Sequence, residues 1–419
     1  MGSTIEEANT YETGLHLLEK LRDLHEGQRL CGEPRNELFS THDDLLLYLL
    51  SLLRGDAHFL PEVSPKVSID EWKKLLSALR SHWIIPLLYY KLRNYPPEFH
   101  PPGEILDQMR MAFLVSRVRS HKVENQLNEI LNSFNRKGIE VIILKGPALA
   151  LSIYPDPATR PYGDLDLLVQ EEDFIRAREL LQEIGYKCKI SRFGHLKGVD
   201  CEEAFIHQKE PDNNIMVELH WKLHMFSGHK DKLNLNELFR RSILLETPSV
   251  SFKILDPIDT LIACVLHMTL THCNDIRLLS VYDIALLLQR ITDKHNWQIL
   301  LERSGEFNAR TGLEKTIKMA QFWTGLNLPA DYIEFHNWPA ASDGEIRTVS
   351  NAMHRHDKPL RTFFKIYLSG TSNPLQKASY VFRLVFPRTD HMRASYPPSR
   401  NWLLPLSYIR RWLKWINRD

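Results

Sequence analysis

The stretch Arg160-Pro-Tyr-Gly-Asp-Leu-Asp-Leu-Leu-Val169 decides the fold that we expect for this chain. Residues 164–169 begin with two aspartates one residue apart and end in an apolar run, which is typical of a strand that becomes buried on both faces. Side chains alternate along a strand, so Asp164 and Asp166 share one face and the leucines between and after them point into the core. Two carboxylates this close repel each other unless a divalent cation neutralises them, so the pair predicts a metal site.

A third carboxylate is predicted on a later strand, in Ile215-Met-Val-Glu-Leu-His-Trp221. Glu218 and His220 share one face of that strand, and the residues between them face the core. A two-metal phosphoryl or nucleotidyl transfer site uses a carboxylate from a neighbouring strand in addition to the first pair. Oxygen ligands favour Mg²⁺ or Mn²⁺. We therefore expect Asp164, Asp166 and Glu218 to be both metal ligands and catalytic residues.

A phosphate site is predicted at Lys145-Gly146, which follows the short apolar strand 141–144 and precedes Pro147. Proline suits the first turn of a helix, where unpaired backbone N–H groups and the helix dipole attract anions. Gly146 permits close approach of a ligand and Lys145 supplies positive charge. The alternative for Lys145 is a solvated lysine at the end of a strand.

Four further polar residues join the predicted site. Arg160 precedes the carboxylates and suits bidentate contact with the same phosphates; the alternative is a surface ion pair with Asp156 or Glu172. His220, His267 and Asp283 are expected to support the ligands. Asp283 in particular lies in an apolar helix and needs a partner, either His267 or a group across a domain boundary.

The order of the predicted elements indicates an α+β fold in which a small mixed-sheet domain is flanked by N- and C-terminal helical domains. Strands are expected at 141–144, 164–169, 186–190, 204–207 and 215–220, with a helix over 173–184. We predict a helical domain over residues 1–136, a sheet domain over 137–255, a second helical domain over 256–370 and a proline-rich, basic C-terminal segment over 371–419.

These motifs resemble the uncharacterised nucleotidyltransferase family of the DNA polymerase beta-like nucleotidyltransferase superfamily. The family pattern matches Leu144-Lys145-Gly146, Arg160, Asp164-Leu165-Asp166 and Glu218-Leu219-His220-Trp221, and His267 and Asp283 resemble its later polar positions. The resemblance covers roughly residues 105–290. It implies metal ligation by Asp164, Asp166 and Glu218, and nucleotide or phosphate contact by Lys145 and Arg160. The usual glycine-serine pair of the superfamily is replaced here by Lys145-Gly146-Pro147.

Composition and charge limit the classes of binding partner that we expect. Lys and Arg number 53 and Asp and Glu 52, so the net charge of +1 provides no basic field for long nucleic acids. The five scattered cysteines indicate neither a disulfide framework nor a cysteine-rich zinc site. The chain shows no secretion leader and no membrane-spanning stretch, so we expect a cytoplasmic protein. For the basic aromatic segment 408–416, docking on the body and contact with an anionic membrane both stay open.

The sequence thus predicts a Mg²⁺- or Mn²⁺-dependent transferase that moves a nucleotidyl group from a nucleoside triphosphate to a hydroxyl or phosphate. The acceptor would be a small molecule, a peptide or a protein, and the resemblance suggests peptide natural-product modification as one setting. Two alternatives are glycosyl transfer from a nucleotide sugar in the same pocket, and a non-catalytic nucleotide-binding or antitoxin-like partner. Release of pyrophosphate supports the first reading and release of a nucleoside diphosphate the glycosyl alternative, whereas the non-catalytic partner would show no turnover.

Overall fold

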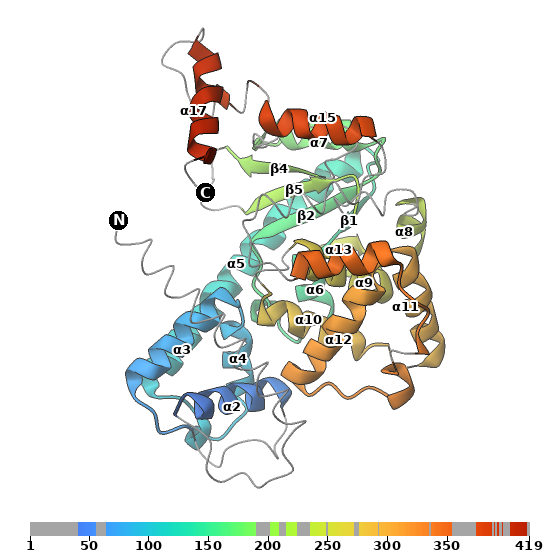
Figure 1. Ribbon diagram of the computed structural model, residues 1–419. Coiled ribbons are helices and arrows are strands. Elements are labelled where there is room, and N and C mark those ends of the chain that lie inside the picture. Colours follow the sequence, from blue (N-terminus) through green and yellow to red (C-terminus); the bar gives the residue numbers. More distant parts are fainter. Residues whose placement is uncertain are drawn as a thin grey trace.

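The computed structural model describes most of the chain outside the N-terminal forty residues (Figure 1). The described residues are 41–55, 64–189, 202–208, 215–223, 235–248, 250–271, 276–291, 293–334, 337–353, 374–387, 389, 392–393, 396 and 403–416. Within them the fold class expected from the sequence is confirmed: a mixed sheet lies between helices that precede it and helices that follow it in the chain.

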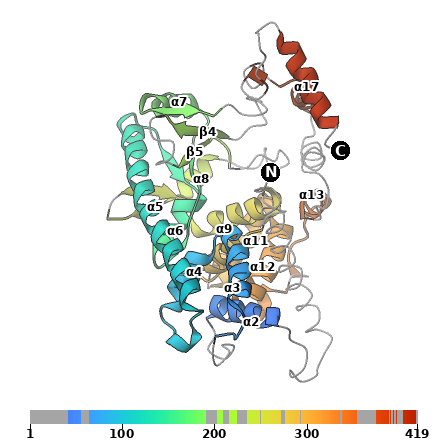
Figure 2. The ribbon, with the colours of Figure 1, turned by 90° about the vertical axis from the view of Figure 1, so that its left-hand side faces the viewer.

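Among the described residues, four α-helices precede the first strand. They are α2 (Thr41–Arg54), α3 (Ile69–Ser81), α4 (Ile85–Leu92) and α5 (Gly103–Arg136). Ser68 begins α3 with a capping box, in which its hydroxyl accepts from the Glu71 N–H while the Glu71 carboxylate accepts from the Ser68 N–H. The long helix α5 runs from the α3–α4 region up along the sheet (Figure 2). It therefore connects the N-terminal helices to the sheet without a break.

Within the described ranges the sheet has seven strands, in the order β3-β4-β5-β2-β1-β7-β6. Their bounds are β1 Val141–Ile143, β2 Asp164–Val169, β3 Tyr186–Cys188, β4 Glu202–His207, β5 Met216–His220, β6 Ile243–Glu246 and β7 Ser251–Ile254. The pairs β2–β5 and β1–β7 are parallel and the other neighbours are antiparallel. The sequence predicted the first five strands, with Ile190 of the expected third strand outside the described residues, and missed β6 and β7.

The two faces of the sheet carry different cores. One face packs on α5 and on α7 (Phe174–Glu183), and here Leu165, Leu167 and Leu219 are fully buried. On this side the ring of Trp221 lies 4.2 Å from that of Phe174. On the other face Leu168 joins the core of the helical parts, which confirms that β2 is buried on both faces at its end. The carboxylates of β2 belong to this second face.

The remaining helices follow the sheet strands or lie between them. Up to residue 353 they are α6 (Lys145–Ser152), α8 (Leu235–Arg241), α9 (Pro257–Leu266), a π-helical turn η5 (His267–Thr271), α10 (Leu278–Leu288), α11 (Lys294–Glu306), α12 (Arg310–Thr324) and α13 (Asp343–Met353), with the short 3-10 turns η3 (Pro157–Thr159) and η6 (Ala330–Tyr332). A further 3-10 turn, η2 (Pro97–Phe99), lies before the sheet, between α4 and α5. None of the described helices combines the length and the apolar character that crossing a bilayer requires. The domain limits predicted from the sequence stay a prediction.

The C-terminal segment forms α15 (Pro374–Val385) and α17 (Leu404–Ile416). Trp412 Nε1 donates to the Val385 carbonyl at 2.9 Å, and the Tyr408 hydroxyl donates to the Pro387 carbonyl at 2.6 Å. The α17 helix is thus docked on the end of α15 through its aromatic residues, while Ile409 remains exposed. The side chain of Trp415, another residue expected at such a contact, lies outside the part of the chain that the structure describes.

Candidate active site

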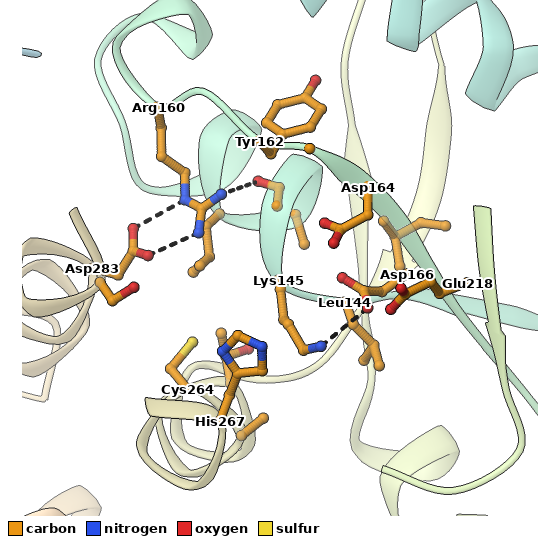
Figure 3. Close-up of a pocket in the computed structure, with 18 of the residues that line it drawn as sticks. Leu144, Lys145, Arg160, Tyr162, Asp164, Asp166, Glu218, Cys264, His267 and Asp283 are labelled. Carbon is orange, nitrogen blue, oxygen red and sulfur yellow. Dashed lines mark hydrogen bonds and ion pairs between the residues drawn. The ribbon is translucent and has the colours of Figure 1, made fainter. Parts of the chain in front are cut away.

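The register of two parallel strands brings the predicted carboxylates together. Asp166 of β2 lies opposite Glu218 of β5, and Leu168 lies opposite His220. Residues opposite each other in a sheet project from the same face, so Asp164, Asp166, Glu218 and His220 all face the same side. Figure 3 shows the three carboxylates converging on one region beside Lys145. The sequence predicted the face of each strand but not their pairing.

Asp166 is almost fully buried, with 1% of its surface exposed. One of its two carboxylate oxygens has two partners. Its Oδ1 lies 3.0 Å from Lys145 Nζ and 2.9 Å from His220 Nε2. Burial would raise the pKa of Asp166, but these two cationic donors outweigh it and hold the pKa well below its ordinary value. Among the described residues its Oδ2 has no hydrogen-bond partner. A buried, ionised carboxylate oxygen without a donor has room for a cation.

The pKa values of the other two carboxylates, Glu218 and Asp164, shift in the opposite direction, upward. Burial, followed by repulsion from Glu202 and Asp166, raises the pKa of Glu218 to about 8. Burial and the charge of Asp166 also raise the pKa of Asp164. Both shifts describe the protein without a cation, because a neighbouring positive charge would favour the ionised forms. Ligand atoms of Asp166, Glu218 and His220, a set that does not include Asp164, all lie within 4.8 Å of one another, so these residues fit a divalent cation.

His220 links this group to a residue that the sequence analysis missed. Its Nδ1 lies 3.2 Å from Glu202 Oε2 on β4, while its Nε2 contacts Asp166. Burial would lower the pKa of His220, but Glu202 and Asp166 together raise it. The hydrogen bond at Nε2 fixes the imidazole against the Asp166 carboxylate, whereas Glu202 places a negative charge beside Nδ1, which has no hydrogen-bond partner among the described residues. The sequence could not show this, because it depends on the pairing of Glu202 with His220 across β4 and β5.

The turn from β1 into α6 places Lys145 over the carboxylates. Lys145 has a φ of +42°, a left-handed conformation that is uncommon for a residue with a side chain. Burial lowers its pKa, but the charge of Asp166 overcomes this effect and raises it, so the ammonium stays charged. A Cβ on Gly146 would lie 2.9 Å from Tyr162 Cβ, so only glycine fits there. The close approach is to Tyr162, whereas the sequence analysis expected it toward a ligand.

Arg160 makes a bidentate ion pair with Asp283 of α10. Its Nε and Nη2 donate to the two carboxylate oxygens at 3.0 and 2.8 Å, and Nη1 donates to the Gly146 carbonyl at 3.4 Å. Figure 3 shows this pair beside the Lys145 turn. The hydroxyl of Tyr154 also donates to Asp283, at 2.7 Å. Arg160 thus pairs with neither Asp156 nor Glu172, and the partners of Asp283 are Arg160 and Tyr154.

These side chains line one cavity. Its volume of about 480 Å³ is within the range of sites that bind small ligands. Its walls include every site residue that the sequence predicted: Lys145, Gly146, Arg160, Asp164, Asp166, Glu218, His220, His267 and Asp283. Further lining residues were missed, including Trp83, Tyr162, Glu202 and Arg277. Trp83 comes from the turn between α3 and α4, far from any motif, so no pattern in the sequence could have identified it.

The chain is similar to one known family and to a solved structure. Residues 68–325, more than half of the chain, match the family model described as uncharacterised nucleotidyltransferase. Among solved structures, the antigenic nucleotidyltransferase-like protein from Paracoccidioides brasiliensis is similar at 16% identity, over 52% of this chain and 98% of that one, with a TM-score of 0.31. No curated protein matches the chain. The extent of the family match shows that this chain belongs to the uncharacterised nucleotidyltransferase family.

Proposed function

We propose that this protein transfers a nucleotidyl group from a nucleoside triphosphate to a hydroxyl or phosphate of a small-molecule or peptide acceptor, using Mg²⁺ or Mn²⁺. The observation that carries the proposal is the buried Asp166, whose Oδ2 lacks a donor among the described residues and which pairs in register with Glu218. Membership in the family supports the class of reaction.

Asp164, Asp166 and Glu218 would hold the cation, because the Nε2 of His220 is engaged by Asp166 and carboxylate oxygens suit a hard cation. When bound, the cation would neutralise charge on the triphosphate and lower the pKa of the acceptor oxygen. Intact, closely grouped carboxylates favour catalysis over a non-catalytic binding role, because grouping them is costly without a cation.

Each side chain around the carboxylates has a distinct task. Lys145 keeps Asp166 ionised and, at the edge of the cavity, offers its ammonium to the triphosphate. His220 orients the Asp166 carboxylate. Arg160 fixes the Gly146 carbonyl, and with it the turn that carries Lys145, onto α10. Arg160 also lines the cavity, and we assign its N–H groups outside these bonds to phosphate contact.

The transfer itself forms one bond and breaks one. The acceptor oxygen attacks the α-phosphorus in line, and the bond from that phosphorus to the bridging oxygen of the β-phosphate breaks. Pyrophosphate leaves with the bonding electron pair. As a ligand of the same cation, Glu218 would help to lower the pKa of the acceptor hydroxyl, whose proton passes to solvent.

The experiment is a product analysis of purified protein with each nucleoside triphosphate, and with UDP- and GDP-sugars, with and without Mg²⁺. Candidate acceptors are followed by mass spectrometry. We expect metal-dependent pyrophosphate release and an acceptor that gains the mass of a nucleotidyl group. The Asp164→Asn/Asp166→Asn double variant should lose this product, whereas Asp107→Asn, which changes an exposed aspartate of α5, should retain it. Unchanged activity in the double variant would overturn the proposal.

A further inference from the structure

Trp83 stands out from the N-terminal helices because of its backbone and its exposure. It lies in the turn between α3 and α4 with a φ of +57°, a left-handed conformation that is strained for a bulky residue. The next two residues, Ile84 and Ile85, are fully buried, but Trp83 is only half-buried and its indole lines the cavity. Part of the ring packs against the core of the helical parts, so the indole bridges that core and the cavity.

The turn that carries Trp83 is held against α10. The Leu279 N–H donates to the His82 carbonyl at 3.4 Å, and the Leu278 N–H donates to His82 Nδ1, also at 3.4 Å. These bonds use N–H groups at the start of α10, which lack partners within the helix. The strained backbone is therefore fixed by an element that itself lines the cavity through Asp283.

Two contacts define the surroundings of the indole. The guanidinium of Arg277 lies over the ring, 4.6 Å from its centroid. The far edge of the ring reaches the backbone of Gly163, where an added Cβ would lie 3.0 Å from Trp83 Cη2. Gly163 immediately precedes Asp164, so the ring ends next to the first carboxylate of the site. Arg277 and Trp83 both line the cavity that holds the carboxylates.

We propose that Trp83, together with Arg277, forms the binding site for the nucleobase of the triphosphate substrate. The inference rests on the proposed function. A planar indole and a planar guanidinium both stack on nucleobases. The triphosphate belongs at the carboxylates and Lys145, and the indole begins one residue from Asp164, so a base attached to that triphosphate meets the indole. Stacking uses the π face that every base has, so this contact by itself accepts all four bases.

Calorimetric titrations in the presence of Mg²⁺ separate the base from the phosphates. The probes are the four nucleoside triphosphates, ribose 5-triphosphate and inorganic tripolyphosphate. We expect wild-type protein to bind at least one nucleoside triphosphate more tightly than ribose 5-triphosphate. Trp83→Leu should weaken that binding by about 5- to 100-fold, since base stacking on an aromatic ring contributes in this range. The same change should leave the affinity for tripolyphosphate within about twofold, because the phosphate ligands are untouched.

Two further variants keep the inference falsifiable if Trp83→Leu is unstable. Trp83→Phe retains a π face and should retain most of the affinity, and Trp338→Leu changes a half-buried tryptophan outside the cavity and should have no effect. If Trp83→Leu or Trp83→Phe weakened the binding of nucleoside triphosphate and of tripolyphosphate equally, this inference would be overturned and the proposed function would not. Wild-type protein that binds none of the six probes would overturn the proposed function and the inference with it.

Discussion

At the scale of single residues, the site depends on one carboxylate that is held ionised and another that is held protonated. Lys145 and His220 keep the proton off Asp166, whereas burial and the neighbouring negative charges retain a proton on Glu218 up to about pH 8. Groups with pKa values displaced in opposite directions at one place are typical of functional sites. A cation that binds here must displace the proton of Glu218 at neutral pH, so binding should release protons and strengthen as pH rises.

The pKa of Glu218 predicts an unusual pH dependence of stability without metal. An unfolded glutamate loses its proton near pH 4.5, but the folded carboxyl keeps it to about pH 8. Between these values the folded protein binds the extra proton, so the free energy of unfolding falls as pH rises. Thermal denaturation in EDTA should therefore show Glu218→Gln to be more stable than wild type at pH 8, by on the order of 1 to 3 kcal/mol.

The comparison has a matched control. Glu179→Gln changes an exposed glutamate of α7 and should follow the wild-type curve. The advantage of Glu218→Gln should shrink toward pH 4.5 and below, where the folded and the unfolded wild-type protein both bind the proton on Glu218. A wild-type protein whose stability relative to Glu218→Gln does not change between pH 4.5 and 8 would contradict the assignment.

At the scale of elements, the turn between β1 and α6 has no space for a larger residue than glycine at position 146. A Cβ there would lie 2.9 Å from Tyr162 Cβ, and both residues are buried, so neither can yield easily. We expect Gly146→Ala to lower the free energy of unfolding by about 1 to 3 kcal/mol, measured by urea denaturation. Gly103→Ala is the control, because nothing lies within 4 Å of its added Cβ and alanine favours the helix; it should be neutral or stabilising. Equal stability of the two variants would contradict the close packing.

The ion pair between Arg160 and Asp283 joins the segment before β2 to α10. Both partners are buried, with exposed fractions of 9% and 3%, so either one left alone is a buried uncompensated charge. Arg160→Met and Asp283→Leu should each destabilise the protein by about 3 to 5 kcal/mol, and the double variant by less than their sum. Chemical denaturation of the four proteins measures this coupling. An additive double variant would show that the pair does not act as a unit.

Some of these elements could be predicted from the sequence and others could not. Alternation that passes into an apolar run identified β2, and alternation identified the carboxylate face of β5, because the period of a strand is a local property. Local patterns failed for β6, whose residues Ile243 and Leu244 are exposed and do not alternate with polar ones. They also could not connect Arg160 with Asp283, which lie 123 positions apart, or Glu202 with His220. Such pairs follow from strand order and helix packing, which only the three-dimensional structure supplies.

At the scale of the whole molecule, the N-terminal helices and the helices after the sheet share one hydrophobic core. Leu52 of α2, Leu88 of α4, Leu261 of α9 and Leu313 of α12 belong to one cluster of buried residues. Arg54 at the end of α2 donates to the Phe322 carbonyl of α12 at 2.5 Å. The cavity likewise takes walls from both parts, through Trp83 and Asp283. The sheet therefore faces helices that pack as one body across the site.

This shared core predicts cooperative unfolding of the two helical parts. Leu52→Ala should lower the free energy of unfolding by about 2 to 5 kcal/mol, because it leaves a cavity in a fully buried position. Hydrogen exchange should then show an equal loss of protection in α4 and α12. Leu181→Ala, in the separate cluster between α7 and the sheet, provides the comparison. Loss of protection limited to α2, α3 and α4 would show that the N-terminal helices unfold independently.

The central claim is that the carboxylates of β2 and β5 bind a divalent cation for nucleotide chemistry. Titration of Mn²⁺, followed by the electron paramagnetic resonance signal of the free ion, tests it without knowledge of the acceptor. We predict that wild-type protein binds Mn²⁺, that a nucleoside triphosphate tightens this binding, and that Asp107→Asn behaves as wild type. Asp166→Asn keeps the size of the side chain but removes its charge, and should weaken Mn²⁺ binding at least about tenfold. Equal Mn²⁺ affinity in Asp166→Asn and wild type would contradict the account.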